Sequence, residues 1–241
     1  IPLAAAVSFG AGFLFGWPAL RLSLVHLILM TWSLSLALPQ VLKLDYFQTW
    51  TGGVSGVYLD RPDPPVWLGL DENQFWYLIT LAIMILLFWL AGNLVSSRSG
   101  RALAAIRDNQ IAAAPMGINI AMFKTTIFGI SAMYAGIGGA LTGLLADFVA
   151  PDTYGLFFSI LLVVGAVISG IRSVWGALVG SILILYLPAA TGALPAALAV
   201  PPFGIIVLLV AFFMPDGISG LTKRTYLRFA YSRKKDQYGS A

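Results

Sequence analysis

Cysteine is absent from this chain of 241 residues, and histidine occurs once, as His26. The absence of thiols excludes disulfides, thiolate metal sites and cysteine-based catalysis. A single histidine excludes a histidine-rich metal centre. Charged residues are also scarce, at 10% of the chain, whereas a soluble domain carries about 25%. Because so little charge cannot cover a water-facing surface, lipid must cover much of this protein.

Long apolar runs are the main feature that is present. Hydrophobic residues make up 59% of the chain, and residues 75–94 contain no charge. That run is long enough for a helix to cross a bilayer, which needs roughly 20 residues. Backbone groups in lipid must bond to one another, and the alternation typical of barrel strands is missing. We therefore expect an all-α, polytopic transmembrane bundle with about seven membrane segments. They are 1–17, 22–42, 75–94, 125–146, 154–171, 174–190 and 202–214.

Basic and acidic residues lie in different connections between these segments. Lysine and arginine collect in the linker 95–124 and the tail 222–241, whereas the connections 43–74 and 147–153 are mainly acidic. Basic connections favour the cytoplasm, so the N-terminus is predicted outside and the C-terminus inside. Residues 1–221 then form one transmembrane domain, and 222–241 form a basic cytoplasmic tail. Orientation also explains the net charge of +4 better than nucleic-acid binding does.

Two of the connections allow alternative interpretations. The long 43–74 connection either docks an extracytoplasmic partner or is a solvated link. The segments 154–171 and 174–190 meet at a tight turn, which favours a helical hairpin, with a re-entrant pair as the alternative.

The cytoplasmic linker 95–124 is predicted to hold a short amphipathic helix. Ser99 is a candidate N-cap, and Pro115 and Gly117 end the helix. The alternative is a helix that lies on the membrane surface. The residues predicted to share its apolar face are Leu103, Ile106, Gln110, Ile111 and Ala114.

Several runs in and around this linker agree, in order, with one family. They are TGGVSG at 51–56, RSGRALAAIRDNQIAAAPMGINI at 98–120, GIGGAL at 136–141, APD at 150–152 and SVWGALVG at 173–180. Together they resemble the permeases of branched-chain amino-acid ABC transporters, of the LivM type. The resemblance covers most of 12–217 and is strongest over 96–188.

The resemblance implies that the linker helix is a coupling helix, on which an ATPase subunit pushes. Ala112-Ala113, followed after three residues by Gly117, resembles the family's AA-x-x-x-G signature, although Ile111 stands where many members carry glutamate. Paired alanines let a partner approach closely, and glycine lets the chain turn away. The expected ATPase-coupling residues are Arg101, Arg107, Ala112, Ala113 and Gly117.

The resemblance also implies partners. They are a second permease subunit, two ATP-binding-cassette ATPases and an extracytoplasmic substrate-binding protein, at the bacterial inner membrane. The chain has no G-x-x-x-x-G-K-[ST] phosphate loop, so ATP must be bound by separate subunits. We expect no cofactor, metal or catalytic residue in this chain, and no enzyme activity. Because Ile1 opens inside an apolar run, we expect the chain to be a fragment, and the resemblance implies that about three N-terminal helices precede it.

Small residues recur every four positions within the apolar segments. Such stripes let helix backbones pack closely, which is their common use in membranes. A substrate role and a rocking interface lined by glycine are the alternatives. The predicted packing residues are Ala132, Gly136, Gly139, Ala140, Gly143, Gly176 and Gly180.

Sibling permeases, ion-coupled transporters and intramembrane enzymes are the alternative functions. Urea and ribose-type ABC permeases are siblings of the same family. An ion-coupled secondary transporter would need acidic residues at the membrane midplane, whereas every Asp and Glu here fits a loop, tail or helix end. An intramembrane enzyme would need a buried nucleophile with a base or a metal cluster. The sequence does not identify the residues of the substrate path.

Overall fold

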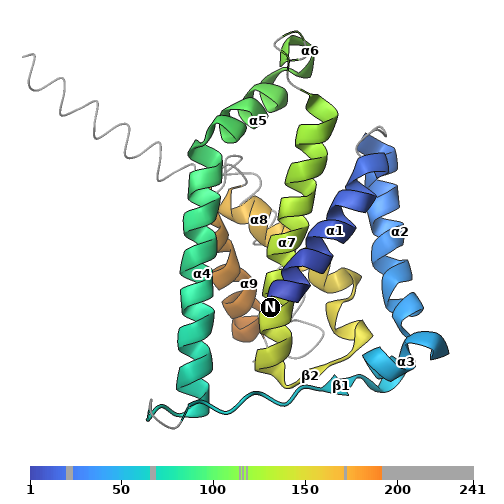
Figure 1. The fold of residues 1–241 in the computed structure, drawn as a ribbon, viewed down its shortest axis with the longest axis vertical. Helices are drawn as coiled ribbons and strands as arrows, with labels where there is room; N and C mark the ends of the chain where they lie inside the picture. The colour runs from blue at the N-terminus through green and yellow to red at the C-terminus, as the bar shows by residue number, and fades with distance from the viewer. Residues whose placement is uncertain are drawn as a thin grey trace, which may run out of the picture. The chain divides into compact units, whose positions relative to one another are not determined.

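The computed structural model describes residues 1–19, 24–65, 69–113, 115, 117, 119–170 and 173–191 (Figure 1). These residues fall into two compact units that divide after Gly155. The two units are described separately below. The expected all-α class is confirmed, with one two-stranded ladder of two residues per strand added.

The first unit is built from four long helices. They are α1 (Pro2–Ala19), α2 (Leu24–Leu42), α4 (Glu72–Ser96) and α7 (Ile120–Ala146). Helix α7 packs against α1 and also contacts α4. The Tyr134 hydroxyl of α7 donates a hydrogen bond to the Leu87 carbonyl of α4, at 3.1 Å. A bond between side chain and backbone is favoured here, since lipid offers neither group another partner.

Small residues allow α1 and α7 to cross closely. A Cβ added to Gly12 would clash with Ala132 and lie 3.2 Å from the Cα of Gly129. A Cβ added to Gly136 would clash with the Ser8 side chain. The crossing therefore depends on small residues from both helices, as close packing in membranes requires.

One end of this unit carries a compact cap, visible in Figure 1 beside the end of α2. Strands β1 and β2 pair antiparallel, with Val57 opposite Val149 and Tyr58 opposite Phe148. The connections 43–74 and 147–153, predicted on the same side of the membrane, are thus joined. The cap consists of α3 (Asp45–Thr51), η1 (Gly53–Ser55), β1 (Val57–Tyr58), β2 (Phe148–Val149) and η4 (Pro151–Tyr154).

The linker between α4 and α7 lies at the opposite end of these helices (Figure 1). It contains α5 (Arg98–Asp108) and α6 (Gln110–Ala113), not one continuous helix. Asn109 interrupts the predicted helix with extended backbone angles, φ −157° and ψ 104°. The predicted N-cap is also wrong, because Ser97 caps α5 and Ser99 lies within its first turn.

The second unit is a pair of helices, α8 (Leu156–Ser169) and α9 (Gly176–Thr191). They contact each other closely, since a Cβ on Gly180 would lie 2.8 Å from the Gly165 carbonyl oxygen. The two predicted segments therefore pack together across a short connection, as a helical hairpin does.

Four helical stretches among the described residues are long and apolar enough to cross a membrane: Val25–Leu42, Glu72–Ser96, Ile120–Ala146 and Pro151–Ser169. Two shorter apolar helices cover Pro2–Pro18 and Gly176–Tyr186. The predicted segment 202–214 and the tail 222–241 lie outside the described residues. Seven crossings and the orientation of the chain therefore stay predictions.

Candidate functional site

The linker helix α5 is attached tightly to the end of α4. The Ser97 hydroxyl accepts from the Gly100 backbone amide at 3.2 Å and donates to the Leu94 carbonyl at 2.7 Å. A Cβ on Gly100 would clash with the Val95 carbonyl oxygen. Ile106, in the predicted apolar face, is only 3% exposed. The linker helix therefore packs onto its own chain and is joined to α4 by a short bend.

The two arginines predicted to serve ATPase coupling lie on α5, and both are exposed. Arg101 donates from Nη1 to the Ser96 carbonyl at 3.2 Å, which satisfies the end of α4. Arg107 pairs with the adjacent Asp108, with Nε 2.9 Å from Oδ1. An exposed ion pair of this kind contributes little to stability, so Arg107 can exchange Asp108 for another anionic partner at little cost in free energy.

The paired alanines of the linker have different surroundings. The Asn109 side chain accepts from the Ala112 amide at 3.1 Å and so caps α6. Ala112 is exposed, but Ala113 is only 2% exposed. Ala113 is thus packed within its own chain, and a contact of both alanines with a partner stays a prediction. Gly117 has φ +76°, a left-handed conformation that suits the expected turn.

The predicted packing residues of α7 divide between two surroundings. Ala132 and Gly136 lie at the crossing with α1, whereas Gly139, Ala140 and Gly143 line a cavity. A Cβ on Gly139 would meet nothing within 4 Å among the described atoms. For Gly139, the predicted close helix contact is thus not met in the described residues. In the second unit, Gly176 and Gly180 lie close to the Ser169 end of α8.

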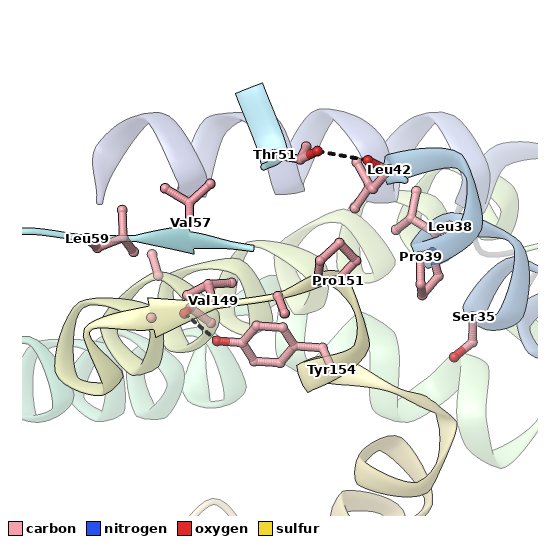
Figure 2. A pocket seen from close by; sticks show the side chains of 14 residues that line it. Ser35, Leu38, Pro39, Leu42, Thr51, Val57, Leu59, Val149, Pro151 and Tyr154 are labelled. Atoms are coloured by element: carbon pink, nitrogen blue, oxygen red, sulfur yellow. Dashed lines mark hydrogen bonds between the residues drawn. The ribbon is translucent and has the colours of Figure 1, made fainter. Parts of the chain in front are cut away.

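The cavity has a volume of about 540 Å³ and lies between α2, α7 and the cap (Figure 2). Leu38, Leu42, Val57, Leu59 and Val149 supply most of its apolar walls. Its lining within the described residues carries no charge. A volume of this size is typical of sites that bind small molecules.

Two hydroxyl groups of the cavity wall, those of Thr51 and Tyr154, are bonded to the chain, and Ser35 supplies a third hydroxyl to the lining. The Tyr154 hydroxyl donates to the Gly139 carbonyl at 3.2 Å. The Thr51 hydroxyl donates to the Leu42 carbonyl at 2.8 Å and accepts from the Gly53 amide at 3.2 Å. Figure 2 shows both hydroxyls at the edge of the apolar lining.

A glycine turn at 51–56 holds the cap over this cavity. Gly52, Gly53 and Gly56 have φ of +68°, +58° and +71°, angles that side chains with a Cβ rarely adopt. A Cβ on Gly52 would clash with the Gly56 carbonyl, and one on Gly56 would lie 2.7 Å from the Val149 carbonyl oxygen. The TGGVSG run therefore serves a close backbone approach between the turn and β2.

Two ion pairs fasten the cap. Lys43 Nζ lies 2.7 and 2.9 Å from the two carboxylate oxygens of Asp152. Arg61 forms a two-point pair with Asp147, with Nη2 at 2.7 Å from Oδ2, and it also donates to the Leu144 carbonyl at 3.0 Å. These charges were interpreted from the sequence only as markers of membrane side.

Two features of this unit were not predicted from the sequence. The stripe Ala4, Ser8, Gly12 and Gly16 on α1 has the same four-residue spacing as the stripe found on α7, so that spacing was available as a signal. The cavity had no comparable signal, because its walls come from segments far apart in the chain.

The comparisons with known proteins agree with the resemblance. A family model described as the permease component of branched-chain amino acid transport systems matches residues 1–214. A high-affinity branched-chain amino acid transport system permease protein, LivM, from Salmonella typhimurium is 27% identical, over 77% of this chain and 48% of the relative. The LivM protein of Escherichia coli is 26% identical over the same shares.

The chain thus spans about half the length of the curated relatives it matches. No solved structure matches it. Since the family match extends over most of the chain, this protein belongs to the family of permease components of branched-chain amino acid transport systems.

Proposed function

We propose that this chain is part of the membrane-spanning permease subunit of an ATP-binding-cassette importer for branched-chain amino acids, in a bacterial inner membrane. Separate ATPase subunits bind and hydrolyse ATP, and a second permease and an extracytoplasmic binding protein complete the assembly. The observation that carries this proposal is the family match, which includes both the membrane helices and the α5–α6 linker.

The linker supports a coupling role through its attachments. Ser97 caps α5 directly after α4, and Asn119 caps α7 by accepting from the Met122 amide at 3.1 Å. A force on α5 is therefore passed directly to α4, and the Asn119 cap fixes the first turn of α7. Coupling requires that the ATPase contact one conformation of the linker better than another. The exposed residues Arg101, Arg107 and Ala112 are the surface proposed for that contact.

The cavity favours the amino-acid branch of the family over its siblings. Urea and ribose expose polar groups over most of their surface, and burying such groups without hydrogen bonds costs free energy. The cavity walls are mainly apolar, and the Thr51 and Tyr154 hydroxyls are already bonded to the chain. A hydrocarbon side chain fits such walls better.

Uptake measurements test the substrate class. Cells that carry the complete transporter should accumulate labelled L-leucine, and unlabelled L-isoleucine and L-valine should compete with it. Labelled urea and ribose should not accumulate above the level of cells without the transporter. Uptake of urea or ribose in place of leucine would contradict the proposal.

A further inference from the structure

An ion pair links two chain segments that contribute residues to the wall of the apolar cavity. Leu42 and Pro151 line the cavity, and their chain neighbours Lys43 and Asp152 form the pair. The Lys43 side chain is 20% exposed and that of Asp152 is 67% exposed. The cationic partner is therefore mostly withdrawn from water, whereas the carboxylate is open to it. One positive and one negative residue are thus next in the chain to lining residues of a cavity whose described lining carries no charge.

We propose that this cavity is a binding site for an L-amino acid with an aliphatic side chain, and that Lys43 and Asp152 bind its charged groups. The inference rests on the proposed function and assigns residues to it. The substrate carboxylate accepts hydrogen bonds from Lys43 Nζ, and the substrate ammonium donates to the Asp152 carboxylate. The side chain enters the space between Leu38, Val57 and Val149.

Charge complementarity supports this occupant. A free amino acid carries one charge of each sign on the same carbon, and both must keep partners when water is lost. In the structure Lys43 and Asp152 satisfy each other at 2.7 Å. A zwitterion can insert between them without leaving either charge unpaired. Removal of one partner would leave a charge uncompensated, which costs far more than the pair contributes.

The glycines of α7 supply a size test with a matched control. Gly138 and Gly139 both have nothing within 4 Å of an added Cβ, but only Gly139 lines the cavity. Gly139→Leu should fill cavity space and lower the uptake of L-leucine more than that of L-alanine. Gly138→Leu makes the same chemical change outside the cavity and should leave the ratio of the two uptakes unchanged.

The charge test uses single and exchanged variants of the pair in the complete transporter. Lys43→Gln and Asp152→Asn should each raise the KM for L-leucine on the order of tenfold, since hydrogen bonds to charged groups are among the stronger ones. In the exchanged variant, Lys43→Asp with Asp152→Lys, the cation and the anion trade places. If the substrate side chain stays in the cavity, the substrate ammonium and carboxylate groups must also trade places. Exchanging these two groups gives the opposite configuration at the α-carbon. The exchanged variant should therefore remain poor for L-leucine, and D-leucine should compete better than it does on the wild type.

A purely structural clasp predicts the opposite pattern. An exchanged pair would restore the cap and recover L-leucine uptake with no gain for D-leucine, and that result would overturn the inference. An unchanged leucine-to-alanine ratio in Gly139→Leu, at equal membrane abundance, would also overturn it. If the wild-type transporter takes up no aliphatic amino acid, the proposed function itself fails. If the wild-type transporter takes up L-leucine and the cavity and ion-pair variants behave like the wild type, only the proposed site is refuted.

Discussion

Replacing a glycine of α1 or α7 by alanine should change the stability of the first unit. The sign of the change should depend on whether the glycine lies in the crossing of the two helices. Gly12 and Gly136 lie in the crossing, whereas Gly10 and Gly138 lie on the same two helices with nothing within 4 Å of an added Cβ. Replacement of glycine by alanine within a helix normally stabilises by roughly 0.5–1 kcal/mol, because glycine loses more backbone entropy on folding. The controls Gly10→Ala and Gly138→Ala should show this gain.

The crossing positions should show a loss. At Gly12 the new methyl would clash with the Ala132 methyl and lie 3.2 Å from the Gly129 Cα. At Gly136 it would clash with Ser8 and lie 3.2 Å from the Ala4 carbonyl oxygen. Backbone atoms cannot rotate aside, so the helices must separate. Overpacking of this kind typically costs about 1–3 kcal/mol, which exceeds the propensity gain.

The assay is the free energy of unfolding of the purified protein in detergent, followed by tryptophan fluorescence for the four variants. Gly12→Ala and Gly136→Ala should lower it, and the two controls should raise it or leave it unchanged. The test is the sign of each change in the free energy of unfolding, because detergent alters its absolute value. A gain at Gly12 or Gly136 equal to that of its control would show that the helices do not depend on this contact.

Two further predictions concern the linker and the membrane sides. Ala112→Glu should abolish coupled uptake and ATPase co-purification while the amount of permease in the membrane stays near normal. Ala113→Glu should also reduce the amount of folded protein, because Ala113 is 2% exposed. Normal uptake and co-purification in Ala112→Glu would refute the coupling surface. Because the chain has no cysteine, single cysteines at Asp63 and Gln110 can be labelled with an impermeant maleimide, and only the first should react from outside intact cells. Reversed labelling would overturn the orientation.

The long helices could be predicted from composition because lipid imposes a simple rule. The segments 22–42, 75–94 and 125–146 match α2, α4 and α7, and the last two helices extend beyond the predicted bounds. Apolar length marks the part of a helix inside lipid, whereas backbone hydrogen bonding continues until a cap or a break ends it. Glu72 and Ile120, the first residues of α4 and α7, therefore lie outside the predicted segments.

The linker was predicted less well because local side-chain bonds decided its form. Ser97 and Ser99 are both plausible caps. Only the hydrogen bond that the Ser97 hydroxyl accepts from the Gly100 amide distinguishes them. Asn109 competes with the helix by bonding the Ala112 amide, and such competition is typical of asparagine. A pattern read on a single ideal helix therefore could not show the break at Asn109.

The cavity and its ion pairs depend on contacts between distant segments. Lys43 meets Asp152 across 109 positions, and the pairing of β1 with β2 has no periodic signal in two-residue strands. The small residues at 139–143 were recognised as a stripe, but a stripe does not reveal whether a helix or a cavity faces it.

Transport in proteoliposomes tests most directly whether this chain belongs to an ATP-driven importer. The vesicles would contain the complete permease of which this chain is part, its second permease and the two ATPases, with the binding protein and labelled L-leucine outside. Leucine should accumulate only when Mg-ATP is supplied to the ATPase side, with no proton or sodium gradient present. Accumulation driven by such a gradient in the absence of ATP would contradict the account.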